Sequence, residues 1–286
     1  MRIAVLTPAP DYPEPWNWAY DVEADALRQC GATVEPRPWT DPGDLTGFDL
    51  ILPLVAWGYH QQFGPWLRLL NRFDAERLPV LNPPALLWWN SDKTYLTQLA
   101  ARYVPTVATI EVDALDDASL AAAADFFGTE QLVIKPPISA SAAGTHLIRV
   151  GEPIPAVERG RRMMIQPFVS SIATEGEYAV ILFDGEHSHT VVKRPKSGDF
   201  RVQEHLGGAT LPADPPPGAV DLARQALAVA PATATYARVD VVRDDEGVLR
   251  IMELELIEPS LFLEHAPDRG AAFANAILSA AARLRE

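Results

Sequence analysis

Cysteine is almost absent from this chain of 286 residues, and so are long apolar runs. The single cysteine, Cys30, excludes an intrachain disulfide, and we expect it to be a buried small residue near the end of a helix. No stretch approaches the ~20 apolar residues that a membrane-spanning helix needs, so no membrane partner is expected. Prolines follow directly after the short apolar run at residues 1–7. A secretory leader is therefore not expected, and the expected location is the cytoplasm.

Positive charge is also in short supply. Lys and Arg number 24 against 38 Asp and Glu, which gives a formal net charge of −14. A chain this acidic repels a nucleic-acid backbone, so nucleic acid is not expected as a partner. An anionic small ligand would have to be met by a local group of cations or by metal ions. Each Lys or Arg in an apolar setting is therefore a candidate for ligand binding.

Strand and helix signals alternate through residues 1–90. Short strands are expected at residues 2–6, 33–39, 48–55 and 79–81, and helices at residues 20–30 and 65–74. This order predicts an α/β domain with a parallel sheet covered by helices. Ligands bind beyond the carboxyl ends of the strands in such sheets. The aromatic-rich segments 7–18 and 56–62 leave those ends and are candidate substrate loops.

From residue 91 onward the signals change. Ser91 is predicted to cap a helix that runs to residue 103. Asp184-Gly185 and residues 244–247 are predicted turns of two β-hairpins, and a closing helix is expected from residue 270 to 285. Antiparallel sheets with flanking helices make this part of the chain α+β. We therefore expect three units, at residues 1–90, 91–170 and 171–286.

The second hairpin carries charged residues on apolar strands. Side chains alternate between the two faces of a strand, so Arg238 and Asp240 share one face, and Glu253 and Glu255 share one face of the partner strand. Three converging carboxylates are costly without a cation. Oxygen-only ligands select Mg²⁺, with Mn²⁺ as the alternative. The other interpretation is that these residues form the solvated face of an antiparallel sheet.

Two lysines upstream are candidates for binding phosphate. Lys135 ends an apolar strand and precedes a loop of small residues, 136–145, whose backbone N–H groups could approach an anion closely. Lys93 stands at the head of a helix. Taken singly, the loop could be an ordinary turn and Lys93 an ordinary solvated lysine.

The order and spacing of these residues resemble the ATP-grasp superfamily, in particular its glutathione-synthetase-like and RimK-like branch. The resemblance covers about residues 90–275, and the segment before it is similar to the domain that precedes the ATP-grasp fold. The resemblance implies two ATP-grasp lobes with antiparallel sheets. The run Glu-Leu-Glu-Leu-Ile-Glu-Pro, at residues 253–259, resembles the subgroup that contains the cycloserine-forming synthetase.

The resemblance also implies roles for individual residues. Nucleotide binding falls to Lys93 and Lys135, to Ser139, Ser141, Gly144 and Thr145 of a closing loop, to Gln166, Phe168 and Val169 on the adenine strand, and to Glu177 at the ribose. The metal ligands would be Asp240, Glu253 and Glu255, and Arg238 would face the transferred phosphate. Arg201 and Lys193 are further candidates for catalytic cations, because they could balance the acidic charge. The loop has less glycine than is usual in the family. At the last metal position this chain has Glu255, where asparagine is common in the family. The additional negative charge of Glu255 must be balanced by cationic side chains nearby.

These roles predict an ATP- and Mg²⁺-dependent ligase. It would activate a small, amino-acid-like carboxylate as an acyl phosphate for attack by an amine, giving an amide or a cyclised product. The alternative is a noncatalytic ATP-binding regulator on the same scaffold. A dinucleotide-dependent oxidoreductase would need a glycine fingerprint after the first strand, where Pro8, Pro10 and Pro13 stand instead. The oligomeric state is left open, a homo-oligomer included.

Overall fold

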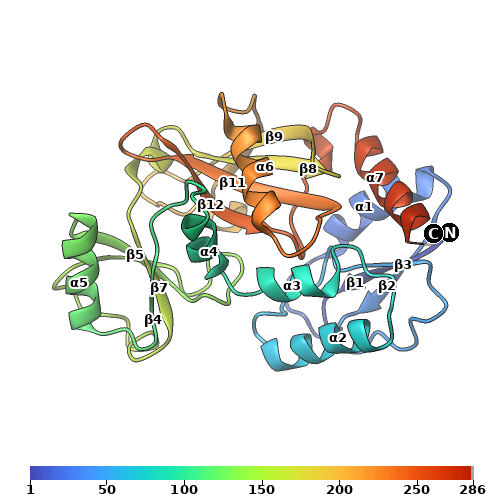
Figure 1. The fold of residues 1–286 in the computed structure, drawn as a ribbon, viewed down its shortest axis with the longest axis horizontal. Coiled ribbons are helices and arrows are strands. Elements are labelled where there is room, and N and C mark those ends of the chain that lie inside the picture. Colours follow the sequence, from blue (N-terminus) through green and yellow to red (C-terminus); the bar gives the residue numbers. More distant parts are fainter. Residues whose placement is uncertain (285–286) are drawn as a thin grey trace.

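The computed structural model describes residues 1–284, which form three sheets surrounded by helices (Figure 1). The first sheet is parallel, in the order β2-β1-β3. It contains β1 (Arg2–Thr7), β2 (Thr33–Pro38) and β3 (Leu50–Leu52). The predicted parallel N-terminal sheet is confirmed.

Alternation along β1 explains how helices cover both faces of this sheet. Ile3 and Val5 share one core cluster with helices α1 (Asn17–Gln29) and α7 (Ala271–Arg283). Ala4 and Leu6 lie in a second cluster with α2 (Phe63–Ala75). Successive strand residues point to opposite faces, so an all-apolar strand needs cover on both sides. The last helix of the chain therefore packs against the first domain.

The second sheet is antiparallel, in the order β4-β7-β5-β6, and lies at the other end of the molecule (Figure 1). Its strands are β4 (Ile110–Val112), β5 (Gln131–Lys135), β6 (His146–Arg149) and β7 (Met163–Pro167). Helix α5 (Asp117–Phe127) covers it. This helix starts at a capping box in which Asp116 accepts from the Ser119 N–H, and it ends at the left-handed Gly128.

The third sheet lies between the other two and is also antiparallel, in the order β10-β9-β8-β11-β12. Its strands are β8 (Glu177–Phe183), β9 (Glu186–Arg194), β10 (Ala209–Pro212), β11 (Tyr236–Arg243) and β12 (Leu249–Glu255). Three helices, α3 (Pro84–Asn90), α4 (Tyr95–Ala101) and α6 (Ala219–Val229), contribute to the core on one face of this sheet. The predicted α+β part with two hairpins is confirmed, and the unit boundaries at residues 90 and 170 stay a prediction.

Several local predictions need correction. Ser91 does not cap a long helix but follows α3, and its hydroxyl donates to the Leu87 carbonyl oxygen. The expected strand at residues 79–81 is reduced to one bridge, between Ile51 and Val80. Cys30 is exposed rather than buried. The closing helix is described to Arg283, and its predicted end at Arg285 lies outside the described residues. None of the helices in residues 1–284 has the length and apolar character needed to cross a membrane.

Candidate active site

A cavity of about 860 Å³ lies where the three sheets meet. Most of the predicted site residues line it: Lys93, Lys135, Ser139, Ser141, Thr145, Gln166, Phe168, Val169, Glu177, Lys193, Arg201, Arg238, Asp240, Glu253 and Glu255. Gly144 is not among the lining residues. Both predicted substrate loops reach the cavity, through Tyr12, Trp18, Trp57 and Tyr59. The structure thus gathers residues that lie far apart in the sequence.

Strands β11 and β12 present the charged residues as opposed pairs. In the antiparallel register Arg238 lies opposite Glu255, and Asp240 lies opposite Glu253. All four residues line the cavity, as the period-two pattern predicted. Directly opposed strand residues have their Cβ atoms about 5 Å apart, so the side chains can interact.

Asp240 is the most enclosed of the three carboxylates, with 2% of its surface exposed. It accepts hydrogen bonds from Arg238 Nε at 3.0 Å and from Lys193 Nζ at 2.7 Å. Burial opposes ionisation, but the two cations outweigh it and lower the Asp240 pKa to about 2. Lys193 also forms an ion pair of 2.5 Å with Glu177, whose pKa is nevertheless raised because the carboxyl is buried.

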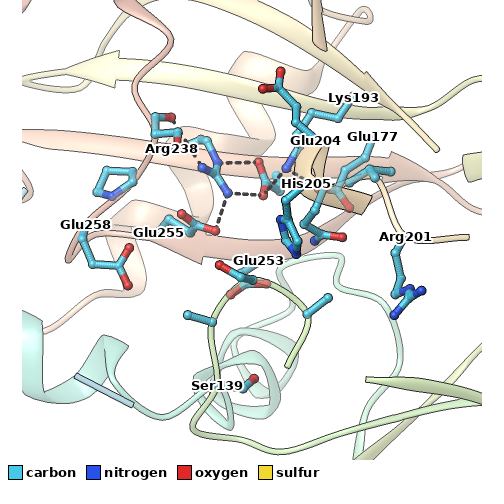
Figure 2. A pocket seen from close by; sticks show the side chains of 18 of the residues that line it. Ser139, Glu177, Lys193, Arg201, Glu204, His205, Arg238, Glu253, Glu255 and Glu258 are labelled. Atoms are coloured by element: carbon cyan, nitrogen blue, oxygen red, sulfur yellow. Dashed lines mark hydrogen bonds and ion pairs between the residues drawn. The ribbon is translucent and has the colours of Figure 1, made fainter. Parts of the chain in front are cut away.

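Glu253 and Glu255 have different partners. Glu253 pairs with Lys93 at 2.8 Å, and Lys93 and Lys135 lower its pKa against the effect of burial. Glu255 pairs with Arg238, yet burial raises its pKa to about 7, helped by the charges of Glu253 and Asp240. Figure 2 shows Arg238 beside Glu255, with Glu258 next to them. This side of the cavity carries more negative charge than its cations balance.

The carboxylates suit a divalent cation by their chemistry, although their present partners are cations of the chain itself. Within residues 1–284, no group of three or more His, Cys, Asp or Glu is arranged to hold a metal ion. Burial is the main cause of the raised pKa of Glu255, and the charges of Glu253 and Asp240 add to it, so a bound cation would favour the ionised form of Glu255. The metal roles of Asp240, Glu253 and Glu255 stay a prediction.

Lys135 differs from the other cations of the cavity. It is 7% exposed, and no described residue forms a hydrogen bond or ion pair with its ammonium. Burial lowers its pKa. An enclosed ammonium without a partner is unfavourable and is well placed to receive an anionic ligand.

Lys93 fixes the loop of small residues that follows Lys135. Its ammonium donates to the Ser139 carbonyl oxygen at 2.6 Å and lies 3.3 Å from the Ser139 hydroxyl. Ser141 and Ala142 have φ of 52° and 58°, so this loop turns without the glycines usual in the family. Gly144 has φ of 70°, and a Cβ there would lie 2.7 Å from Pro136 Cγ. Gly144 therefore shapes the loop rather than the cavity surface.

Residues of the predicted adenine strand, 166–169, already form contacts within the chain. The Gln166 side chain donates to the Thr109 hydroxyl at 2.9 Å, and the Phe168 N–H donates to the Gln131 carbonyl oxygen. The Phe168 ring meets the ring of Phe200 edge-on at 6.2 Å. This contact brings Arg201 over the cavity, where Asp199 holds it through two hydrogen bonds of 3.1 and 2.9 Å. The adenine and ribose roles stay predictions.

Glu258 is one of several acidic residues of the cavity that were not singled out from the sequence. Glu258 lines the wall just beyond β12 and has no hydrogen-bond or ion-pair partner within residues 1–284. Burial raises its pKa to about 8, and the neighbouring Glu255 adds to this. The signal was present in the sequence as the third glutamate of the run at residues 253–259.

Side chains from the segment between the domains hold the end of β12. Asn90 donates to the Leu254 carbonyl oxygen and accepts from the Leu256 N–H. Tyr95 likewise exchanges two hydrogen bonds with the backbone of Leu254. Because β12 is an edge strand, these bonds satisfy backbone groups that no further strand pairs, and they fix the strand that carries Glu253 and Glu255.

Known proteins resemble this chain in sequence. The family model described as D-cycloserine synthetase DcsG, N-terminal domain, matches residues 3–82. The cycloserine biosynthesis protein DcsG of Streptomyces lavendulae is 29% identical over 278 residues, covering 88% of this chain and 90% of that protein.

Solved structures extend the likeness to the whole chain. The crystal structure of D-cycloserine synthetase DcsG superimposes with a TM-score of 0.83 at 26% identity, over 98% of this chain and all of that one. The D-alanine–D-alanine ligase of Bacillus anthracis gives a TM-score of 0.72 at 16% identity, over 100% of this chain and 98% of that one. The chain is therefore similar to DcsG over nearly its whole length, and its fold is that of the ATP-grasp ligases.

Proposed function

We propose that this chain is an ATP-dependent ligase that activates a small carboxylate as an acyl phosphate and joins it to an amine-type nucleophile, releasing ADP and phosphate. The observation that carries the proposal is the single cavity in which Lys93, Lys135, Lys193 and Arg238 face Asp240, Glu253 and Glu255. Phosphoryl transfer depends mainly on positioning and charge stabilisation, and this arrangement supplies both.

The position of each residue in the cavity suggests a separate role in the reaction. Lys135, which has no hydrogen-bond or ion-pair partner among the described residues, and Lys93 would bind phosphate oxygens. Arg238, held in place by Asp240 and Glu255, would face the transferred group. When bound by Asp240, Glu253 and Glu255, Mg²⁺ supplies neutralisation of the triphosphate charge. Mn²⁺ accepts the same oxygen ligands and is an alternative.

Acyl phosphates hydrolyse, so the cavity must exclude water during the reaction. The loop at residues 136–145 stands on one wall, tied to Lys93 through Ser139. The segment at residues 194–208, with Phe200 and Arg201, stands over the predicted adenine strand. We propose these two segments as the closing elements over the nucleotide.

The similarity to DcsG favours an amino-acid-like carboxylate as the substrate. It also makes cyclisation of a single substrate molecule a candidate reaction beside the joining of two molecules. Intermolecular amide formation consumes two organic substrates for each ADP, and cyclisation consumes one. Stoichiometry measured against ADP therefore separates the two reactions.

The test is phosphate and ADP release with ATP, Mg²⁺ and a library of amino acids and 2-hydroxy acids. We expect at least one carboxylate to raise ADP formation well above the buffer rate, and hydroxylamine to trap the acyl phosphate as a hydroxamate. ATP binding without ADP formation under any carboxylate would instead identify a noncatalytic regulator and refute the proposal.

A further inference from the structure

The N-terminal side of the cavity has a wall of different chemistry from the phosphate side. It combines two acids, Glu23 on α1 and Glu258 beyond β12, with the aromatic residues Tyr12, Trp18 and Trp57. The Trp57 ring lies 5.7 Å from that of Trp18 and 6.4 Å from that of Tyr12. We call these five residues the acidic–aromatic wall.

Glu23 is an unusual residue for such a position. It is 5% exposed, and its Oε2 atom is buried without any hydrogen-bond partner in the described chain. Burial raises its pKa well above the usual value. A buried acid without a partner is destabilising, and it needs an explanation outside the contacts of the chain.

Glu258, on the opposite side, is only partly buried but likewise lacks a partner among the described residues. Asp240, Glu253 and Glu255 each pair with a Lys or Arg, whereas Glu258 pairs with no residue that the structure describes. In Figure 2, Glu258 lies beside Glu255, on the other side of the labelled cluster from Arg201. The charges of Glu23 and Glu258 both act on Tyr236, whose pKa is raised mainly by burial. Both acids therefore act on the buried Tyr236, and both line the cavity.

The chemistry of this wall selects its ligand. An anion beside these two acids would raise their pKa further and would gain no cation partner, so this wall does not suit a phosphate or carboxylate group. A cationic amine matches it, because an ammonium group has three N–H donors for carboxylate oxygens and is attracted to the faces of aromatic rings. A neutral hydroxyl in the same place would not favour ionisation of either acid, whose pKa is raised in the free chain, whereas a cationic amine stabilises both as carboxylates.

We propose that Glu23 and Glu258 bind the cationic amine of the carboxylate substrate, with Tyr12, Trp18 and Trp57 around it. This inference rests on the proposed ligase function and deepens it, since it names a specificity site. The amine would lie against the N-terminal domain, and the carboxylate would point toward Lys93 and Lys135.

The first experiment compares amino acids with the 2-hydroxy acids of the same carbon skeletons, using ADP formation by the whole chain. We expect stimulation by one or more amino acids and at least tenfold weaker stimulation by the matching hydroxy acids. Equal stimulation by the two series would overturn the inference and leave the ligase proposal standing. If no compound stimulates ADP formation, the ligase proposal fails and the inference fails with it.

The second experiment measures Glu258→Gln and Glu23→Gln against the control Asp21→Asn, which changes an exposed acid on the same helix as Glu23. We expect the KM for the stimulating amino acid to rise at least tenfold in each Gln variant, and the KM for ATP to change less than twofold. Melting temperatures report folding, and neither Gln variant should lower that of the free chain. An unchanged amino-acid KM in both Gln variants would refute the inference.

Discussion

Replacing Glu258 with glutamine should stabilise the free chain at alkaline pH. The carboxyl of Glu258 has a pKa of about 8 in the folded chain, against a usual value of 4.5, because it is buried beside Glu255. An acid whose pKa is raised by folding binds protons more tightly in the folded state. Its contribution to stability is therefore intact below pH 4.5 and is lost as the pH rises toward 8.

The magnitude follows from the same two values. Each pH unit between 4.5 and about 8 costs about 1.4 kcal/mol, which sets an upper bound of about 5 kcal/mol. Glu258 is only partly buried and titrates together with Glu255, so we expect about 2 kcal/mol between pH 5 and pH 8. For a chain of this size that corresponds to about 4 °C in melting temperature.

The assay is thermal unfolding of the wild type, Glu258→Gln and Asp21→Asn at pH 5, 6.5 and 8, without nucleotide. All three should melt together at pH 5. At pH 8 the Glu258→Gln variant should melt highest, while Asp21→Asn follows the wild type. If Glu258→Gln loses as much stability as the wild type between pH 5 and pH 8, the charge of Glu258 does not act as the structure indicates.

Three further substitutions test the rest of the site. Lys135→Ala should lower ADP formation at least 100-fold with an unchanged circular dichroism spectrum, and wild-type ADP release would contradict the phosphate role of this unpaired lysine. Asp240→Asn should cost about 3 kcal/mol in urea unfolding, because Arg238 and Lys193 lose the charge that they share; an unchanged midpoint would argue against that ion-pair cluster. Gly144→Ala should lower the free energy of unfolding by about 1–3 kcal/mol and raise the KM for ATP, because the added Cβ would press on the Pro136 ring at a φ of 70°. Gly151→Ala is the matched control, since Gly151 also has a positive φ but lies in open space. Equal KM values for ATP in the two variants would refute the role of the loop.

The sequence predicted features of this fold that depend on neighbours along the chain. Asp184 and Gly185 adopt φ of 49° and 77°, and a short turn of this kind fixes the register of the strands it joins. The alternation in β11 and β12 likewise placed Arg238, Asp240, Glu253 and Glu255 correctly, since side-chain direction in a strand has period two.

Predictions failed where tertiary contacts decide. Ser91 had the sequence of a helix cap, but Pro84 starts a separate helix, and the Ser91 hydroxyl accepts from the Trp66 indole N–H. The pairing of Lys193 with Asp240 joins residues 47 positions apart across three neighbouring strands. Strand order and edge contacts determine such pairs, and no local pattern in the sequence encodes them.

The pairing of charges in the free chain has a consequence for metal binding. Lys93 forms an ion pair with Glu253, and Arg238 and Lys193 form ion pairs with Asp240. In the chain without nucleotide, these carboxylates are therefore poorly available as metal ligands. Triphosphate oxygens would draw Lys93 away from Glu253 and release that carboxylate for the metal. By linkage, the metal must strengthen triphosphate binding by the same factor. We therefore expect calorimetry to show weak Mg²⁺ binding to the free chain. With a nonhydrolysable ATP analogue bound, Mg²⁺ should bind at least tenfold more tightly, after correction for the affinity of Mg²⁺ for the analogue in solution. Equal Mg²⁺ affinity with and without the analogue would show that the Lys93–Glu253 pair does not control the metal site.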